Sequence, residues 1–218
     1  MITYNQIKND EAIRVYVKEA DASLEALGYT EHSFAHVVKV AETAGYILNT
    51  LGYDERTVEL SKIAGFLHDI GNLVNRVDHS QSGAIIAFRI LDKLGMEPTE
   101  IAPIVAAIGN HDEGTGVPVN AVAAALIIAD KSDVRRSRVR GKIESGDIHD
   151  HVNYSVTDSS LSIDKDKSSI ILDLKIDTSI SSVMDYFEIF LGRMSLCRKA
   201  ADRLGLRFKL IINNQQLL

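Results

Sequence analysis

The residues of this chain best suited to chemistry are histidines and aspartates in its first 130 positions. Imidazole and carboxylate are ligands that Fe, Mn, Zn, Co and Ni accept together. We expect these side chains at helix ends or on helix faces, and they are His32, His36, His68, Asp69, His79, His111 and Asp130. Jointly they predict a site for divalent transition metals, whereas a single histidine such as His32, His149 or His151 is more often a surface or satisfied core residue.

Asp130 and the adjacent pair His68-Asp69 each have a further physical reason to belong to such a metal site. Asp130 directly follows the apolar run Ala124–Ala129, and a carboxylate that ends a buried helical stretch is costly unless it is paired or bound to a metal. His68 and Asp69 are adjacent, just before Gly71. Neighbours within a helix point about 100° apart, but at a helix end the two side chains can flank one cluster from different sides.

Six helices are predicted before residue 140, because apolar residues recur there every three or four positions. The predicted ranges are 12–27, 31–51, 55–68, 80–94, 99–110 and 120–139. Thr99 can serve as the N-cap of the fifth helix. The sixth is almost wholly apolar from Val122 to Ala129, so we expect it to be the buried central helix.

The pattern changes after residue 150. Residues 161–164, 169–177 and 206–212 are predicted strands, and residues 179–204 are a predicted amphipathic helix. We therefore predict a mainly α protein with a helical bundle as its metal-binding domain over residues 1–150. A small α+β appendage (hairpin, helix, strand) over residues 151–218 is expected to pack on it.

Composition narrows the classes of function. The net charge is −6, so the chain lacks the positive field of a general nucleic-acid binder. A single cysteine, Cys197, excludes a disulfide framework and a Cys-rich zinc site. The apolar runs are shorter than the ~20 residues of a membrane span. We expect a cytoplasmic protein that binds neither an extended nucleic acid nor a membrane, and whose appendage can form a homodimer surface.

Set on consecutive helices, His36, His68-Asp69 and Asp130 resemble the H…HD…D signature of the HD-domain superfamily of metal-dependent phosphohydrolases. The resemblance covers about residues 30–140, and His79 and His111 are similar to the extra ligands of its binuclear members. It implies an HD-domain helical bundle with two divalent metal ions (Fe, Mn, Zn, Co or Ni). One ion would take His36, His68, Asp69 and Asp130, and the second His79 and His111, with Asp69 bridging.

The sequence departs from the family pattern at two positions. Many HD phosphohydrolases have Lys three residues after the HD aspartate, where this chain has Asn72. Another cation must then supply the missing charge. Some binuclear members have Glu four residues before the first histidine, where this chain has His32. Since His32 and His36 share a helix face by their i,i+4 spacing, His32 is either an additional ligand or a group that contacts the ligands or the substrate.

The resemblance and the ligand chemistry predict a phosphohydrolase that acts on a nucleotide or another small phosphorylated metabolite, as a phosphomonoesterase or a phosphodiesterase. Two metals about 3.5–4 Å apart can hold a bridging hydroxide that attacks phosphorus, and Asp69 would be central to that catalysis. Asp112 and Glu113 lie in a loop predicted at the pocket rim, where either can act as general acid or support His111.

A basic stretch follows Asp130 directly. Residues 131–140 contain five cations and one acid in a chain that is acidic overall. If the sixth helix continues, Lys131, Arg135 and Arg138 share one face and can bind the substrate phosphate in place of the cation lost at Asn72. Lys131 is then a catalytic candidate, and Arg135, Arg138 and His32 are substrate-binding candidates. The alternative is a solvated helix end.

Two other classes of function stay open. Some HD proteins use the same ligands in di-iron oxygenases, and an HD fold can also serve as a non-catalytic nucleotide-sensing regulator. The intact ligand set favours the enzyme. Residues 147–151 (Asp-Ile-His-Asp-His) also resemble ligands, but they are predicted to form a loop with local hydrogen bonds.

Overall fold

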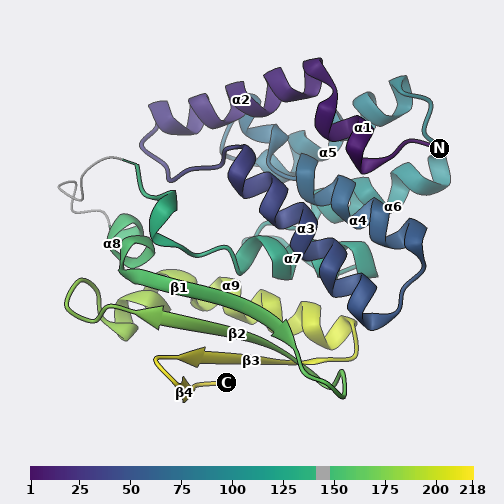
Figure 1. Ribbon diagram of the computed structural model, residues 1–218. Helices are drawn as coiled ribbons and strands as arrows, with labels where there is room; N and C mark the ends of the chain where they lie inside the picture. The colour runs from purple at the N-terminus through teal and green to yellow at the C-terminus, as the bar shows by residue number, and fades with distance from the viewer. Residues whose placement is uncertain (141–147) are drawn as a thin grey trace.

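The computed structural model describes residues 1–140 and 148–218, and it shows a mainly helical protein with a small four-stranded sheet on one side (Figure 1). This confirms the predicted fold class. The helices of the body are α1 (Tyr4–Asn9), α2 (Glu11–Ala26), α3 (Phe34–Leu51), α4 (Glu55–Leu67), α5 (His79–Lys93), α6 (Pro98–Gly109) and α7 (Ala121–Lys131), with a 3-10 helix η1 (Ile70–Leu73) between α4 and α5.

Side-chain caps decide where several of these helices begin. Ser33 caps α3, Asp54 caps α4 and Asn120 caps α7, each accepting a hydrogen bond from a backbone N–H of the first turn. The predicted cap at Thr99 is wrong. Helix α6 begins one residue earlier at Pro98, after Glu97, because the fixed φ of proline suits the first helical position.

Helix α7 is the buried centre of the body, as predicted, and every residue from Val122 to Ala129 is buried. The prediction that it continues to residue 139 is wrong. It ends at Lys131, where the Ser132 hydroxyl donates a hydrogen bond to the Ala129 carbonyl oxygen over 3.0 Å. A short 3-10 turn η2 (Arg136–Arg138) follows. The basic residues after Asp130 therefore do not share a helix face.

The C-terminal part contains α8 (Ile148–Ser155), β1 (Val156–Ile163), β2 (Ser169–Ile176), α9 (Val183–Arg203), β3 (Arg207–Ile212) and β4 (Gln215–Gln216). The strand order is β1-β2-β3-β4, with β2 and β3 parallel and the other pairs antiparallel. Helix α9 is the crossover between the parallel strands. It packs on β2 and β3 and also on α7 (Figure 1).

One expectation for the C-terminal part needs correction. Residues 148–151 belong to helix α8 instead of a loop, while Asp147 lies outside the described residues. Helix α8 also runs across the expected domain boundary at residue 150. The buried apolar residues of the helices and the sheet join in one core, because α9 uses its buried residues against both α7 and the strands. Within the described ranges, no helix is long and apolar enough to cross a membrane.

Candidate metal centre

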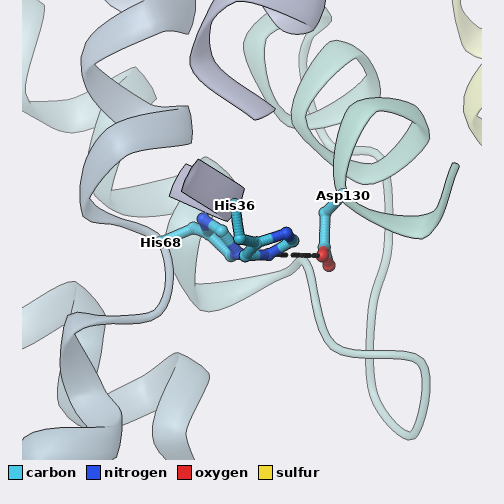
Figure 2. Close-up of side chains that lie close together, drawn as sticks. All are labelled: His36, His68 and Asp130. Atoms are coloured by element: carbon cyan, nitrogen blue, oxygen red, sulfur yellow. Dashed lines mark ion pairs between the residues drawn. The ribbon is translucent and has the colours of Figure 1, made fainter. Parts of the chain in front are cut away.

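The histidines and aspartates singled out in the sequence meet at one place, where helix ends of the body converge. His36 lies in the first turn of α3, His68 follows α4, and Asp130 lies near the end of α7. Figure 2 shows these three side chains pointing toward one another. The others come from the start of α5 and from the residues after α4 and α6. His36 and His68 are fully buried, and Asp69, His79 and His111 are also buried.

Asp69 lies at the middle of this cluster, with its two oxygens directed to different histidines. Its Oδ2 is 3.6 Å from Nε2 of His36 and 3.2 Å from Nε2 of His68. Its Oδ1 is 3.6 Å from Nε2 of His79 and 4.0 Å from Nε2 of His111. The carboxylate therefore lies between two groups of imidazoles, which is the arrangement of a bridging ligand.

Asp130 completes the first group. Its Oδ1 is 3.4 Å from Nε2 of His36 and 3.7 Å from Nε2 of His68 (Figure 2). The second group is also tight, because the Nε2 atoms of His79 and His111 are 3.2 Å apart. Two ligand atoms that each lie about 2.1 Å from one ion are separated by roughly 3–4 Å. Both groups have that spacing.

The imidazoles are held in the tautomer that a metal requires. Nδ1 of His68 is 2.8 Å from the Gly65 carbonyl oxygen, and Nδ1 of His111 is 2.6 Å from the carbonyl oxygen of Ile108. A carbonyl oxygen only accepts, so each Nδ1 carries the proton and each neutral ring has its lone pair on Nε2. The rings of His79 and His32 are held in the same way by backbone carbonyls.

His36 is oriented by a carboxylate instead. Its Nδ1 is 2.8 Å from Oδ2 of Asp133, which is buried. Asp133 is itself held by Lys39, whose Nζ is 2.8 Å away, and by Nε of Arg135 at 2.9 Å. A carboxylate on the far nitrogen fixes the ring and raises its basicity as a ligand.

The buried ring nitrogens also show that the residues fit a metal. Nε2 of His36 and Nε2 of His68 are buried and have no hydrogen-bond partner among the described residues. A buried polar atom without a partner costs about 1–3 kcal/mol, and a shared cation would remove that cost. His36, His68 and Asp130 form one set that could hold an ion, and His68, Asp69 and His111 form another.

The charges of the cluster support the same conclusion. Burial by itself would raise the pKa of Asp130, but the Lys131 ammonium and the neighbouring imidazoles hold it well below its usual value. Burial lowers the pKa of His111 to about 3, so this ring is neutral at pH 7. For His68, burial is outweighed by Asp69 and Asp130, which raise its pKa to about 10 in the metal-free protein. A cation between these groups would take the place of that proton.

A pocket of about 190 Å³ opens beside the cluster. Its lining includes Asp69, Asp130 and the imidazoles of the second group, together with Lys131, Arg138 and His32. Nζ of Lys131 is 2.8 Å from Oδ2 of Asp130 and 2.6 Å from Oε2 of Glu113. The metal cluster is therefore open to a small ligand on the side that carries cationic side chains.

The HD domain family matches residues 33–143, about half of the chain. The chain belongs to the HD domain family. This confirms the resemblance inferred from the histidines and aspartates, all of which except His32 lie within the matched range.

Individual proteins match parts of the chain. Ribonuclease Y of Desulforamulus reducens is 32% identical over 118 residues, which is 53% of this chain and 22% of that protein. Uncharacterized protein MJ1020 of Methanocaldococcus jannaschii is 24% identical over 160 residues, which is 63% of this chain and 61% of that protein. The chain thus matches about a fifth of ribonuclease Y and about three fifths of MJ1020.

A solved structure is also similar. The crystal structure of a predicted HD superfamily hydrolase from an uncultured Thermotogales bacterium has 26% sequence identity and a TM-score of 0.46. The similarity covers 57% of this chain and 67% of that chain.

The substrate-binding candidate Arg135 and the catalytic candidate Asp112 are not among the described residues that line the pocket of this HD protein. Arg135 pairs with Asp133 and Glu31 instead, because α7 ends at Lys131 and the turn after it separates Arg135 from Lys131 and Arg138. Asp112 is half-buried and is not among the described residues that line the pocket. It acts at longer range, since burial lowers the pKa of His79 and Asp112 is one of the carboxylates that oppose this shift.

The two departures from the HD pattern have distinct places in the structure. Asn72 is buried, and its Nδ2 donates hydrogen bonds to Oδ1 and to the carbonyl oxygen of Asp69. It therefore orients the bridging carboxylate. His32 lines the pocket with its Nε2 4.0 Å from Oδ2 of Asp69, and burial is the main cause that holds its pKa well below the usual value.

Sequence reasoning missed several residues of the pocket. Arg76, Arg193, Phe190, His149 and Asp150 all line it. Arg76 precedes α5 and reaches Nε2 of His79 at 3.3 Å. Residues 147–151 are predicted from the sequence to form a loop with local hydrogen bonds, whereas α8 carries His149 and Asp150 to the pocket. No periodicity in the sequence distinguishes these residues from surface charges, since the packing of α8 and α9 on the body places them there.

Proposed function

We propose that this HD-domain protein is a metal-dependent phosphohydrolase for a small phosphate ester, such as a nucleotide or another phosphorylated metabolite. The observation that carries the proposal is the convergence of imidazole Nε2 atoms on both oxygens of Asp69. Two of these nitrogens are buried and have no hydrogen-bond partner in the part of the chain that the structure describes. His36, His68, Asp69 and Asp130 would hold one divalent ion, and Asp69, His79 and His111 would hold the second.

A bound pair of divalent ions would supply Lewis acidity to a phosphoryl group and lower the pKa of a water. The chain's own residues supply the rest. Lys131, buried beside Asp130, offers an ammonium to the negative charge that develops on the phosphoryl oxygens. Burial opposes its charge, but Asp130 and Glu113 raise its pKa, which favours the ammonium form.

Ribonuclease Y, by its name, acts on RNA, and the similarity to it supports cleavage of a phosphate ester bond. Two features of the pocket, its size and its closed side, nevertheless favour a small ester over a nucleic acid. The pocket of this chain measures about 190 Å³, below the ~300–1,000 Å³ of sites for drug-sized ligands. Helices α8 and α9 also close one of its sides with Asn153, Phe190 and Arg193.

The test combines metal analysis with a substrate panel. We expect purified protein to contain close to two transition-metal ions per chain and to release phosphate from small phosphate esters. Asp69→Ala and His79→Gln are expected to lose metal and activity. His151→Gln is the control, because His151 lies on α8 but is not a described lining residue of the pocket. Folded protein with no metal above trace would refute the proposal, and O₂-dependent turnover without phosphate release would identify an oxygenase instead.

A further inference from the structure

Two arginines line the pocket from distant parts of the chain. Arg138 follows α7 within the HD match, and its side chain is almost fully buried. Its Nε donates to the Glu31 carbonyl oxygen and its Nη1 to the Asp133 carbonyl oxygen, both over 2.9 Å. A guanidinium has five N–H donors, so these carbonyls fix its position and use only two of them.

Arg193 lies on α9, beyond the last residue of the HD match. Its Nε donates to Oε1 of Glu113 over 3.0 Å, and its guanidinium lies over the ring of Phe190, 4.5 Å from the centroid. Phe190 and Glu113 line the pocket as well. The contact with Phe190 and the ion pair with Glu113 restrain the guanidinium. The ion pair uses Nε, and a guanidinium has further N–H donors on Nη1 and Nη2 that can form paired hydrogen bonds with an oxyanion.

A series of ion pairs connects Arg193 to the metal cluster through Glu113 and Lys131. Asp130 contacts Lys131, Lys131 contacts Glu113, and Glu113 contacts Arg193. Lys131 is therefore next to a metal ligand, whereas Arg193 is two ion pairs further out. A phosphoryl group at the cluster would meet Lys131, and Arg193 would face a group further along the substrate.

The balance of charge in the pocket favours an anion at this outer position. The described lining residues include the cations Arg76, Lys131, Arg138 and Arg193 and the acids Asp69, Glu113, Asp130 and Asp150. Once Asp69 and Asp130 hold metal, two acids face four cations. Burial lowers the pKa of Arg138, Asp133 and Asp130 oppose that shift, and the Arg193 charge adds to it. Because both arginines line the same pocket, an anion between them would offset the repulsion of their like charges.

We infer that Arg138 and Arg193 form a second anion subsite, and that the substrate is a small phosphate ester with another negatively charged group besides the scissile phosphate. The inference rests on the proposed function for the identity of the first group. The second group is a carboxylate or a second phosphate, since a guanidinium pairs with either through two parallel hydrogen bonds.

The test uses three probes on one three-carbon skeleton. Glycerol 3-phosphate has only the scissile phosphate, 3-phosphoglycerate adds a carboxylate, and 2,3-bisphosphoglycerate adds both a carboxylate and a second phosphate. Wild-type protein is expected to prefer a two-anion probe in kcat/KM. The preference is measured as kcat/KM for the two-anion probe divided by kcat/KM for glycerol 3-phosphate. Arg193→Gln is expected to reduce this ratio by about tenfold or more, because a hydrogen bond between charged groups contributes at least about that factor.

Arg198→Gln is the matched control, because Arg198 lies on the same helix, is exposed and is not a described lining residue of the pocket. Its preference is expected to equal that of the wild type. Arg193→Lys keeps the charge without the paired hydrogen bonds and is expected to lie between wild type and Arg193→Gln. It also serves as the variant of choice if Arg193→Gln does not fold. An equal loss for all three probes would place Arg193 on the scissile phosphate and overturn the second subsite.

Binding of the same probes separates this inference from the proposed function. Dissociation constants are measured by calorimetry for metal-free wild-type and Arg193→Gln protein. If the wild type releases no phosphate from any ester, the proposed function fails. The subsite still stands if the two-anion probes bind more tightly than glycerol 3-phosphate and lose that advantage in Arg193→Gln. Equal binding of all probes to the wild type would overturn it.

Discussion

The contact between Asp133 and His36 gives the sharpest prediction, because it acts on only one of the two metal positions. Asp133 Oδ2 accepts from Nδ1 of His36 over 2.8 Å, and both side chains are buried. His79 and His111 of the other group are oriented by backbone carbonyls instead. Loss of the Asp133 carboxylate should therefore weaken the first metal and leave the second in place.

The expected magnitude follows from the role of such partners. Loss of a carboxylate that orients a ligating imidazole costs roughly 10- to 100-fold in metal affinity, or about 1.4–2.8 kcal/mol. Asp133→Asn keeps an acceptor of the same shape and removes the charge, so we expect the lower end of this range. Asp133→Ala removes the hydrogen bond as well and should reach the upper end.

The assay is competition for Mn²⁺ or Zn²⁺ with a chromophoric chelator, read as the affinity and the number of ions bound per chain. Lys39→Gln is the control, since it removes a partner of Asp133 without touching the imidazole contact. The reasoning is refuted if Asp133→Ala binds two ions with the affinity of the wild type. An equal weakening of both ions would also refute it, because the predicted effect is confined to the ion held by His36.

Three further changes test the packing and the charges. Gly71→Ala should displace α5 and weaken binding of the second metal ion, because a Cβ at this position would collide with the backbone carbonyl of His79, the first residue of that helix. The control is Gly192→Ala on α9, where an added Cβ meets nothing within 4 Å, and metal titration should show both ions bound to it. Ile127→Ala should lower the free energy of unfolding by about 2–5 kcal/mol in urea denaturation, since this α7 side chain is fully buried; a loss below 1 kcal/mol would contradict a packed centre. Glu113 is partly buried, which opposes its charge, but Lys131 holds its pKa below the ordinary 4.5. The ionised Glu113 carboxylate therefore stabilises the fold above pH 4.5, and this stabilisation is lost as pH falls through the lower pKa of the folded state. The difference in free energy of unfolding between wild type and Glu113→Gln should accordingly shrink on acidification. A difference that grew on acidification would contradict the role of the ion pair.

The helical body and most of the metal cluster could be predicted without the structure. The apolar period of the chain located α2 to α6 and the start of α7 to within about three residues, because each of these helices must bury one face. It did not predict α1 or the end of α7. Asp130 stood out since a carboxylate at the end of an apolar helix needs a partner, and His68-Asp69 stood out at a helix end. These are local features, so the sequence alone carries them, and the HD family match covers the same residues.

Only the tertiary structure determines which residues orient the metal ligands and the pocket cations. His36 and Asp133 are 97 positions apart, and Arg193 and Glu113 are 80 positions apart. Nothing in the local sequence pattern marks Asp133 as the partner of His36, or distinguishes Arg193, which lines the pocket, from the exposed Arg198. The end of α7 at Lys131 also depends on contacts beyond the helix, because Asp133 leaves the helix to hold His36. Side chains from distant segments become neighbours only when α3, α7 and α9 pack together. This packing places a defined set of cations around the pocket beside the metal cluster.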